Sequence, residues 1–204
     1  MQTQTQLEKD RLVEQKIQKL RVLYADAPEV GRAALKNGLT MITEELAAAG
    51  RAQTAGRIGA RQGEVSELTV FLPFVEGGAK RLRGLLQLLE GNFRAADAVG
   101  TVHDMRFVFL DNDTKLLFTT AYDDEWDPYI DDFATKIPNA MDLWLCNFEG
   151  FPGMKNARAA ADWIAKHQIA AEAWYVNSPN LTAPETRRLE KVGGAVEELL
   201  DKVG

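Results

Sequence analysis

The central part of the chain alternates between apolar runs of strand type and one segment with helical spacing. The runs SELTVFLPFV, TVHDMRFVFL and KLLFTTAY occupy residues 66–75, 101–110 and 115–122. β-Branched and aromatic residues are enriched in these runs, which predicts three strands. Between the first two, leucines recur every three or four residues over 79–98, the pattern of an amphipathic helix. The turn Asp111-Asn112-Asp113 joins the last two strands as a hairpin.

A second helix and a fourth strand complete this unit. Residues 126–137 have helical spacing, Pro138-Asn139 ends that helix, and MDLWLCNF at 141–148 is an apolar run of strand length. The order of elements between residues 64 and 150 is then strand, helix, strand, hairpin strand, helix, strand. This is the βαββαβ order of ferredoxin-like folds.

The flanking segments predict further helices. Residues 6–24 and 30–49 have the spacing of a helical hairpin, and the Gly- and Arg-rich stretch 51–63 has the composition of a linker. After residue 150 we expect a helix at 156–167, a strand at 170–177 and a helix at 184–203 that starts with the capping box Thr182 to Glu185. The predicted fold is α+β: an N-terminal helical hairpin and linker (1–60), then a ferredoxin-like domain with a C-terminal α-β-α extension (61–204).

Composition narrows the function. The 204 residues carry a net charge of −6 without a cluster of basic residues, which argues against a nucleic-acid partner. No run of about 18 apolar residues suggests a membrane span, and the polar N-terminal residues do not have the order of a signal peptide, so we expect a cytoplasmic protein. One cysteine and two histidines argue against a zinc site built by the protein.

The segment from Val102 to Phe107 is the richest in chemical groups. His103 lies on a predicted strand, and the pKa of an imidazole suits proton transfer. Asp104 and Arg106 lie two residues apart on the other face of that strand, so they can pair with each other or hold an anionic group. The alternative is structural: a histidine bonded to a loop carbonyl and a surface ion pair.

Several further residues are candidates for a binding site. Phe107, Phe109 and Phe118 on the hairpin are candidates for an apolar wall. Glu149, in the turn after the predicted fourth strand, is either a buried base or part of a structural turn. The acidic residues between 123 and 132 are expected to be a solvated helix start, because neighbouring carboxylates point to different faces of a helix.

The predicted sheet has helices on one face only. Side chains of the second predicted strand alternate between the two faces of the sheet. The uncovered face would carry one of these two sets of side chains, and each set contains large apolar residues. Such a patch is too apolar to face water in a monomer. We therefore expect a homodimer in which two sheets meet face to face.

The strand SELTVFLPF, the segment VHDMRFVFLDNDTKLLFTTAYD and the turn EGFPG together resemble the dimeric α+β barrel superfamily over about residues 64–180. The resemblance implies a pocket role for His103 and Arg106, which match a His-x-x-Arg strand, and for Tyr122, at the end of the next strand. It also implies oxygenase- or peroxidase-like chemistry with either no cofactor or haem. Haem proteins of this fold usually take their axial histidine from a helix, and the only helix histidine expected here is His167.

Two kinds of function follow as hypotheses. The first is an oxidoreductase, monooxygenase- or peroxidase-like, acting on an apolar or aromatic small molecule. In it His103 is the acid or base, Arg106 holds an anionic oxygen and Asp104 orients one of them. The second is a non-catalytic protein: a dimer that binds a hydrophobic ligand or haem, or an interaction module that uses the N-terminal hairpin.

Overall fold

The computed structural model describes residues 4–48 and 53–203. The chain divides into two compact units, Met1–Arg51 and Ala52–Gly204. Each unit is described by itself below.

The first unit is helical, as the spacing of its apolar residues predicts. Its helices are α1 (Gln4–Leu23), α2 (Glu29–Asn37) and α3 (Leu39–Ala48). The second predicted helix is therefore divided in two at Gly38, whose backbone N–H bonds the carbonyl of Ala34 and ends α2. Ile17 of α1 is buried in this small unit.

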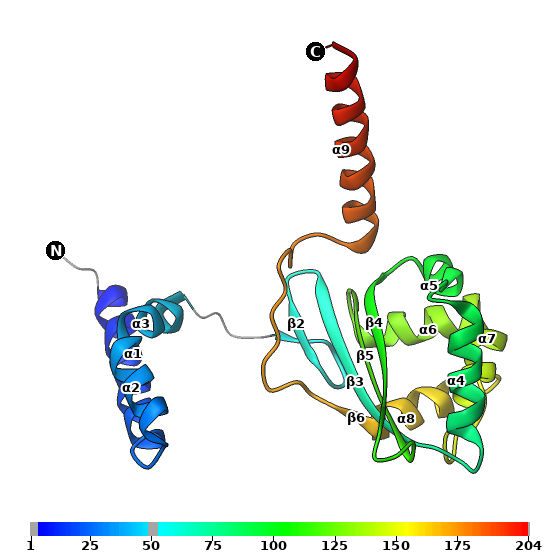
Figure 1. Ribbon diagram of the computed structural model, residues 1–204, viewed down its shortest axis with the longest axis horizontal. Coiled ribbons are helices and arrows are strands. Elements are labelled where there is room, and N and C mark those ends of the chain that lie inside the picture. The colour runs from blue at the N-terminus through cyan, green and yellow to red at the C-terminus, as the bar shows by residue number, and fades with distance from the viewer. Residues whose placement is uncertain (1–3, 49–52, 204) are drawn as a thin grey trace. The chain divides into compact units, whose positions relative to one another are not determined.

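The second unit is built on an antiparallel sheet (Figure 1). Its strands are β1 (Gln53–Thr54), β2 (Ala60–Gln62), β3 (Val65–Pro73), β4 (Val102–Leu110), β5 (Lys115–Asp123) and β6 (Gln168–Ile169). They lie in the order β1-β2-β3-β5-β4, and β6 also pairs with β3. Strand β3 is consequently central, which agrees with the apolar character of its sequence.

The three long strands confirm the predictions from the apolar runs. Strands β4 and β5 form the predicted hairpin, in which Leu110 pairs with Lys115. Its turn residues Asp111, Asn112 and Asp113 all have positive φ angles, of 52°, 53° and 65°. Asn and Asp tolerate this left-handed conformation better than other residues with a side chain, which explains why the turn has this composition.

Helices cover one face of this sheet (Figure 1). They are α4 (Gly78–Leu89), α5 (Arg94–Val99), α6 (Trp126–Lys136), α7 (Pro138–Leu145) and α8 (Ala157–His167). Every second residue of β3 and β5 is buried beneath them, for example Leu72 and Leu116, which are 1% and 0% exposed. Helix α9 (Ala183–Val203) starts beside the sheet and extends away from it.

The predicted fourth strand at 141–148 is wrong. Residues Pro138–Leu145 form helix α7. The residues after it form an isolated bridge between Phe148 and Phe74, which directly follows β3. Pro138 lies in the first turn of α7, where a proline is well tolerated, and does not only end the helix before it. Met141 and Leu145 are buried one helical turn apart, so the apolar run has a helical period.

Three other boundaries differ from the prediction. The strand predicted at 170–177 is wrong, because these residues form no strand in the described chain. The short strand β6, which pairs with β3, ends just before them. The helix predicted over 79–98 is divided into α4 and α5. The segment 51–63, predicted as a linker, contains the short paired strands β1 and β2. Residues 51 and 52 at its start lie outside the described residues.

The fold class is α+β, as the sequence predicts, and the sheet is open and antiparallel. Among the helices in the described ranges, none is both long and apolar enough to cross a membrane.

Candidate functional site

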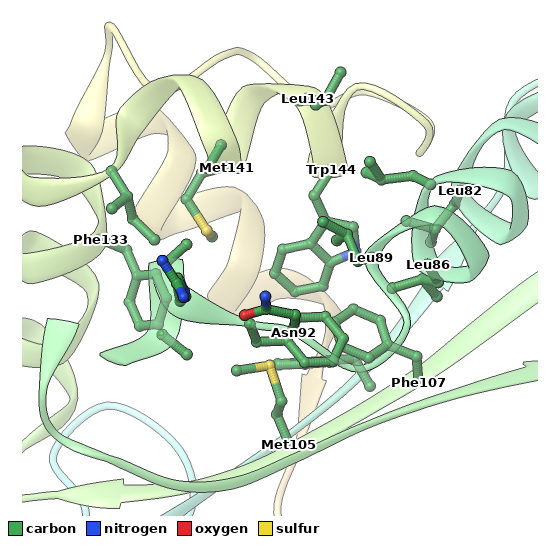
Figure 2. A pocket seen from close by; sticks show the side chains of 18 of the residues that line it. Leu82, Leu86, Leu89, Asn92, Met105, Phe107, Phe133, Met141, Leu143 and Trp144 are labelled. Atoms are coloured by element: carbon green, nitrogen blue, oxygen red, sulfur yellow. The ribbon is translucent and has the colours of Figure 1, made fainter. Parts of the chain in front are cut away.

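A cavity of about 410 Å³ lies between the covered face of the sheet and helices α4, α5, α6 and α7 (Figure 2). Nearly all of its surface is apolar. Its lining residues are Leu82, Leu85, Leu86, Leu89, Asn92, Phe93, Arg94, Ala95, Ala96, Met105, Phe107, Phe118, Tyr129, Phe133, Ile137, Ala140, Met141, Leu143 and Trp144. Ligand pockets in proteins usually measure about 300–1,000 Å³, so this cavity has the size of a small-molecule site.

The sheet supplies the floor of the cavity. Met105 and Phe107 lie two residues apart on β4, so they point to the same face. Phe107 pairs with Phe118 of β5, and residues directly opposite each other on paired strands share a face of the sheet. Figure 2 shows Met105 and Phe107 rising from the strand toward Trp144 of α7.

Aromatic rings form one wall of the cavity. The ring centroids of Phe107 and Phe118 are 5.0 Å apart, and those of Phe118 and Trp144 are 4.7 Å apart. Phe107 also contacts the edge of Trp144 at 5.2 Å and stacks with Phe93 at 5.8 Å. These distances lie within the favourable range for aromatic pairs, so the rings hold one another in place. The contacts within the wall are therefore contacts of its own rings.

Helix α4 supplies the opposite wall through its apolar stripe. Leu82, Leu85, Leu86 and Leu89 are three or four residues apart and share one face of the helix. Leu82 is fully buried, whereas Leu89 is 37% exposed near the end of the helix. The stripe therefore runs from the core to the open end of the cavity.

The open end exists because the predicted long helix is interrupted. Glu90 caps α4 with a φ of 49°, and Gly91 follows with a φ of 77°. This left-handed pair stops the helix and turns the chain. After the turn Phe93 stacks on Phe107, and Asn92 and Arg94 reach the edge of the cavity. A continuous helix over 79–98 would not place these three residues there.

Few polar groups border the cavity. The phenol oxygen of Tyr129 is 3.3 Å from the hydroxyl of Thr120, and burial raises the pKa of Tyr129 above its usual value. Its phenol therefore stays neutral. The indole nitrogen of Trp144 is covered by other atoms and has no hydrogen-bond partner within the described residues. Asn92 and Arg94 are exposed at the open end.

Two of the predicted wall residues line the cavity. Phe107 and Phe118 lie where the alternation of the strands puts them. Phe109 points to the same face but lies farther along the strand, stacked on Phe74 at 5.4 Å and under the guanidinium of Arg83 at 4.1 Å.

Tyr122 and Glu149 lie away from the cavity. Tyr122 is fully buried and stacks on Tyr129 at 3.8 Å, and burial raises its pKa. Glu149 is exposed in the turn after α7, where its backbone N–H bonds the carbonyl of Pro73.

The charged candidates lie elsewhere on the sheet. Arg106 donates to the carboxylate of Asp104 at 2.8 Å, as the two-residue spacing predicts, and both side chains are exposed on the face that helices do not cover. His103 lies in a β-bulge, where the register between β4 and β5 shifts. Its Nε2 is 2.6 Å from the carboxylate of Asp123. None of these four residues lines the cavity.

The pair of His103 and Asp123 also holds the start of α9. The backbone N–H of Ala183 donates to both carboxylate oxygens of Asp123, at 3.0 and 3.1 Å. A carboxylate at the first amides of a helix satisfies groups that have no partner within the helix. The predicted capping box is confirmed beside it: Thr182 and Glu185 exchange hydrogen bonds at 2.8 to 3.3 Å.

Most of the cavity lining was not identified from the sequence. The leucines of α4 lie in a predicted helix, and Trp144 of α7 lies in the predicted fourth strand. Their apolar spacing indicates a buried face, but it does not distinguish a packed core from a cavity wall.

The residues around the cavity do not fit a haem. Axial haem ligands are histidine, cysteine, tyrosine, or methionine together with histidine. Among the described lining residues there is neither histidine nor cysteine, and the Tyr129 phenol is buried against Thr120. His167, at the end of α8, has its Nδ1 2.8 Å from the carbonyl of Trp163.

No metal-binding cluster occurs within residues 4–48 and 53–203. Three of the acidic residues between 123 and 132 pair with separate basic residues. Asp124 pairs with Arg61, and Asp127 pairs with Arg57. Asp132 pairs with Lys136 one turn further along α6.

Comparison with known proteins leaves the site to be judged on its geometry. No protein-family model matches the chain, and neither a curated protein nor a solved structure matches it.

Proposed function

We propose that this protein binds a small apolar or aromatic molecule in the cavity between the sheet and helices α4 to α7. The observation that carries the proposal is the cavity itself, with about 410 Å³ of space and an almost wholly apolar lining. Protein interiors are close-packed, and voids larger than a water molecule are few. An apolar cavity of this size attracts apolar ligands, because water inside it finds few polar partners.

The energetic argument points the same way. The cavity is open to solvent, so part of its apolar wall is in contact with water. Each Å² of this apolar surface that a ligand covers contributes about 25 cal/mol to binding. The pre-formed aromatic wall also means that little ordering is needed on binding.

The test uses N-phenyl-1-naphthylamine, a neutral aromatic probe whose fluorescence rises in an apolar environment. We expect saturable binding of one probe per chain. Replacing Ala96, which lines the cavity on α5, with phenylalanine should fill the site and weaken binding by at least about tenfold. The matched control is Ala98→Phe, because Ala98 is exposed on the same short helix and does not line the cavity.

Thermal unfolding of both variants checks that they are folded. Non-saturable fluorescence with the parent protein, or equal affinity for the parent and Ala96→Phe, would contradict the proposal.

The second candidate function is an oxidoreductase of the monooxygenase or peroxidase type. The observation that favours it is the close, partly buried pair of His103 and Asp123, an arrangement that orients an imidazole for proton transfer. In this hypothesis the substrate binds beside His103 and not in the cavity, because neither His103 nor Arg106 lines the cavity. Variants His103→Ala and Arg106→Lys distinguish the two functions: loss of turnover with retained ligand affinity supports catalysis, and unchanged turnover in both excludes these residues from it.

We further infer a ferredoxin-like origin for the sheet. The order β6-β3-β5-β4 is the order 4-1-3-2 of such sheets, with β6 reduced to two residues as the fourth strand. This inference supports the resemblance to the dimeric α+β barrel superfamily.

A homodimer through the uncovered face of the sheet is part of the same proposal. Phe71 and Val108 alternate with the buried residues of their strands and are 36% and 43% exposed, and Ile169 is 49% exposed. Val108→Lys should therefore shift the sedimentation coefficient from dimer to monomer. The control Leu88→Lys, on the exposed side of α4, should not. A parent protein that sediments as a monomer at all concentrations would exclude this dimer.

A further inference from the structure

The cavity has a single charged residue among its lining groups within the described part of the chain. That residue is Arg94, which lies in the first turn of α5 beside the open end. All other lining side chains except Asn92 are apolar or aromatic. In a chain with a net charge of −6, the only charge on this apolar surface is positive.

Arg94 has no counter-ion among the residues that the structure describes. In residues 4–48 and 53–203, no carboxylate lies within ion-pair distance of its guanidinium, and the side chain makes no hydrogen bond. Other arginines around the sheet are engaged: Arg57 bonds two carboxylates, and Arg83 pairs with Asp113. The guanidinium of Arg94 is therefore available to an anionic group at the cavity opening.

We propose that the ligand of the cavity is an anionic amphiphile, with an apolar body inside the cavity and a terminal carboxylate at Arg94. This rests on the proposed function, because it assigns a chemical class to the ligand of the same site. A planar guanidinium binds a carboxylate through two parallel hydrogen bonds, which sets the orientation of the ligand. The amide of Asn92, on the same edge of the cavity, adds a neutral hydrogen-bonding group.

The volume sets the size of the apolar body. A water molecule occupies about 30 Å³ of liquid, so the cavity holds roughly a dozen groups of that size. Decanoate, with ten carbon atoms and two oxygens, matches this capacity. Decan-1-ol and decylamine have bodies of the same length with neutral and cationic ends, so the three molecules differ mainly in the charge that meets Arg94.

The expected effect is moderate because Arg94 is exposed. Ion pairs in contact with solvent contribute at most about 1 kcal/mol, which corresponds to an affinity ratio of about two- to fivefold. Salt screens such pairs, so the preference for decanoate should shrink as ionic strength rises. The affinity for decan-1-ol should not fall with added salt.

The experiment is displacement of N-phenyl-1-naphthylamine by each of the three molecules, near neutral pH, at low ionic strength and below their aggregation concentrations. In the parent protein we expect decanoate to bind about two- to fivefold more tightly than decan-1-ol, and decylamine to bind most weakly. In Arg94→Gln the decanoate affinity should fall to that of decan-1-ol, while the affinity for decan-1-ol stays the same. The control Arg158→Gln removes an exposed arginine on α8 that does not line the cavity and should leave the order unchanged.

Two different failures are distinguishable. Equal affinity for decanoate and decan-1-ol in the parent, or a decanoate preference that persists in Arg94→Gln, overturns the anionic ligand while leaving the apolar site in place. If neither the probe nor any of the three molecules binds, the apolar binding function itself is overturned, and the anionic ligand with it.

Discussion

Replacing Asp123 with alanine should destabilise the second unit more than any exposed carboxylate does. The side chain is only 7% exposed and connects three elements. It lies at the end of β5, meets His103 of β4 at 2.6 Å, and accepts two hydrogen bonds from the first amide of α9. Alanine removes all three interactions and leaves the imidazole and the amide without this partner.

The magnitude follows from the separate contributions. Loss of a side-chain cap at a helix start costs about 0.5–2 kcal/mol. Loss of a hydrogen bond to a charged group costs about 1.5–3 kcal/mol. His103 is 21% exposed, so its imidazole can bind water in the variant. We therefore expect the free energy of unfolding to fall by about 2–3 kcal/mol, near the lower end of the sum of the two contributions. In a unit of this size, each kcal/mol corresponds to about 2–4 °C in Tm.

The assay is urea and thermal unfolding of the parent and the variant, followed by far-UV circular dichroism. The control is Asp127→Ala, which removes an exposed carboxylate paired with Arg57 and should cost less than about 1 kcal/mol. A double-mutant cycle with His103→Ala should give a coupling energy, because the two side chains share one interaction. If Asp123→Ala is as stable as the control, the carboxylate does not connect these elements and the reasoning fails.

Three further predictions concern stability. Leu82→Ala, at a fully buried position of α4, should cost about 2–5 kcal/mol in urea unfolding, and a cost below 1 kcal/mol would show that the cavity wall collapses without penalty. Gly78→Ala should destabilise, since its Cβ would lie 2.3 Å from the carbonyl oxygen of Asn147, whereas Gly84→Ala meets no atom within 4 Å and should stabilise the helix by about 0.5–1 kcal/mol; the reverse order of their Tm values would contradict this geometry. Hydrogen bonds from Thr182 lower the pKa of Glu185, so its contribution to α9 is present above the ordinary carboxylate pKa and is lost as pH falls through the lowered value. Helical ellipticity should fall in that acidic range in the parent but not in Glu185→Gln, and equal acid profiles would exclude the effect.

Local patterns account for the elements that the sequence predicts correctly. Strands β3, β4 and β5 have long runs of strand-forming residues, and their hairpin turn has the Asp and Asn residues that tolerate positive φ angles. Helix α9 begins at a capping box, whose two partners are only three residues apart in the chain. Such features depend on neighbours in the sequence, so they are visible without the fold.

The errors occur where two local interpretations compete. The run at 141–148 is apolar throughout, and a short run of this kind fits a buried strand or a buried helix equally well. Its helical form is settled by Met141 and Leu145, which pack into the core one turn apart. The segment 170–177 has strand-forming residues, but it forms no ladder within the described chain. Its hydrogen bonds to the sheet are those from the Gln62 amide to the carbonyl of Trp174 and from the Ala171 N–H to the carboxylate of Glu67.

The sequence alone determined the strand period of β3, β4 and β5. It also determined that side chains alternate between the two faces of β4 and β5 and that each face carries apolar side chains. Only the tertiary structure decided which set faces the helices, because this depends on the pairing of Phe107 with Phe118 and on the layer of helices above them. It also decided that the interrupted helix at Glu90 and Gly91 leaves a cavity with Arg94 at its opening. A cavity is the space left between side chains from distant segments, so no local pattern in the chain encodes it directly.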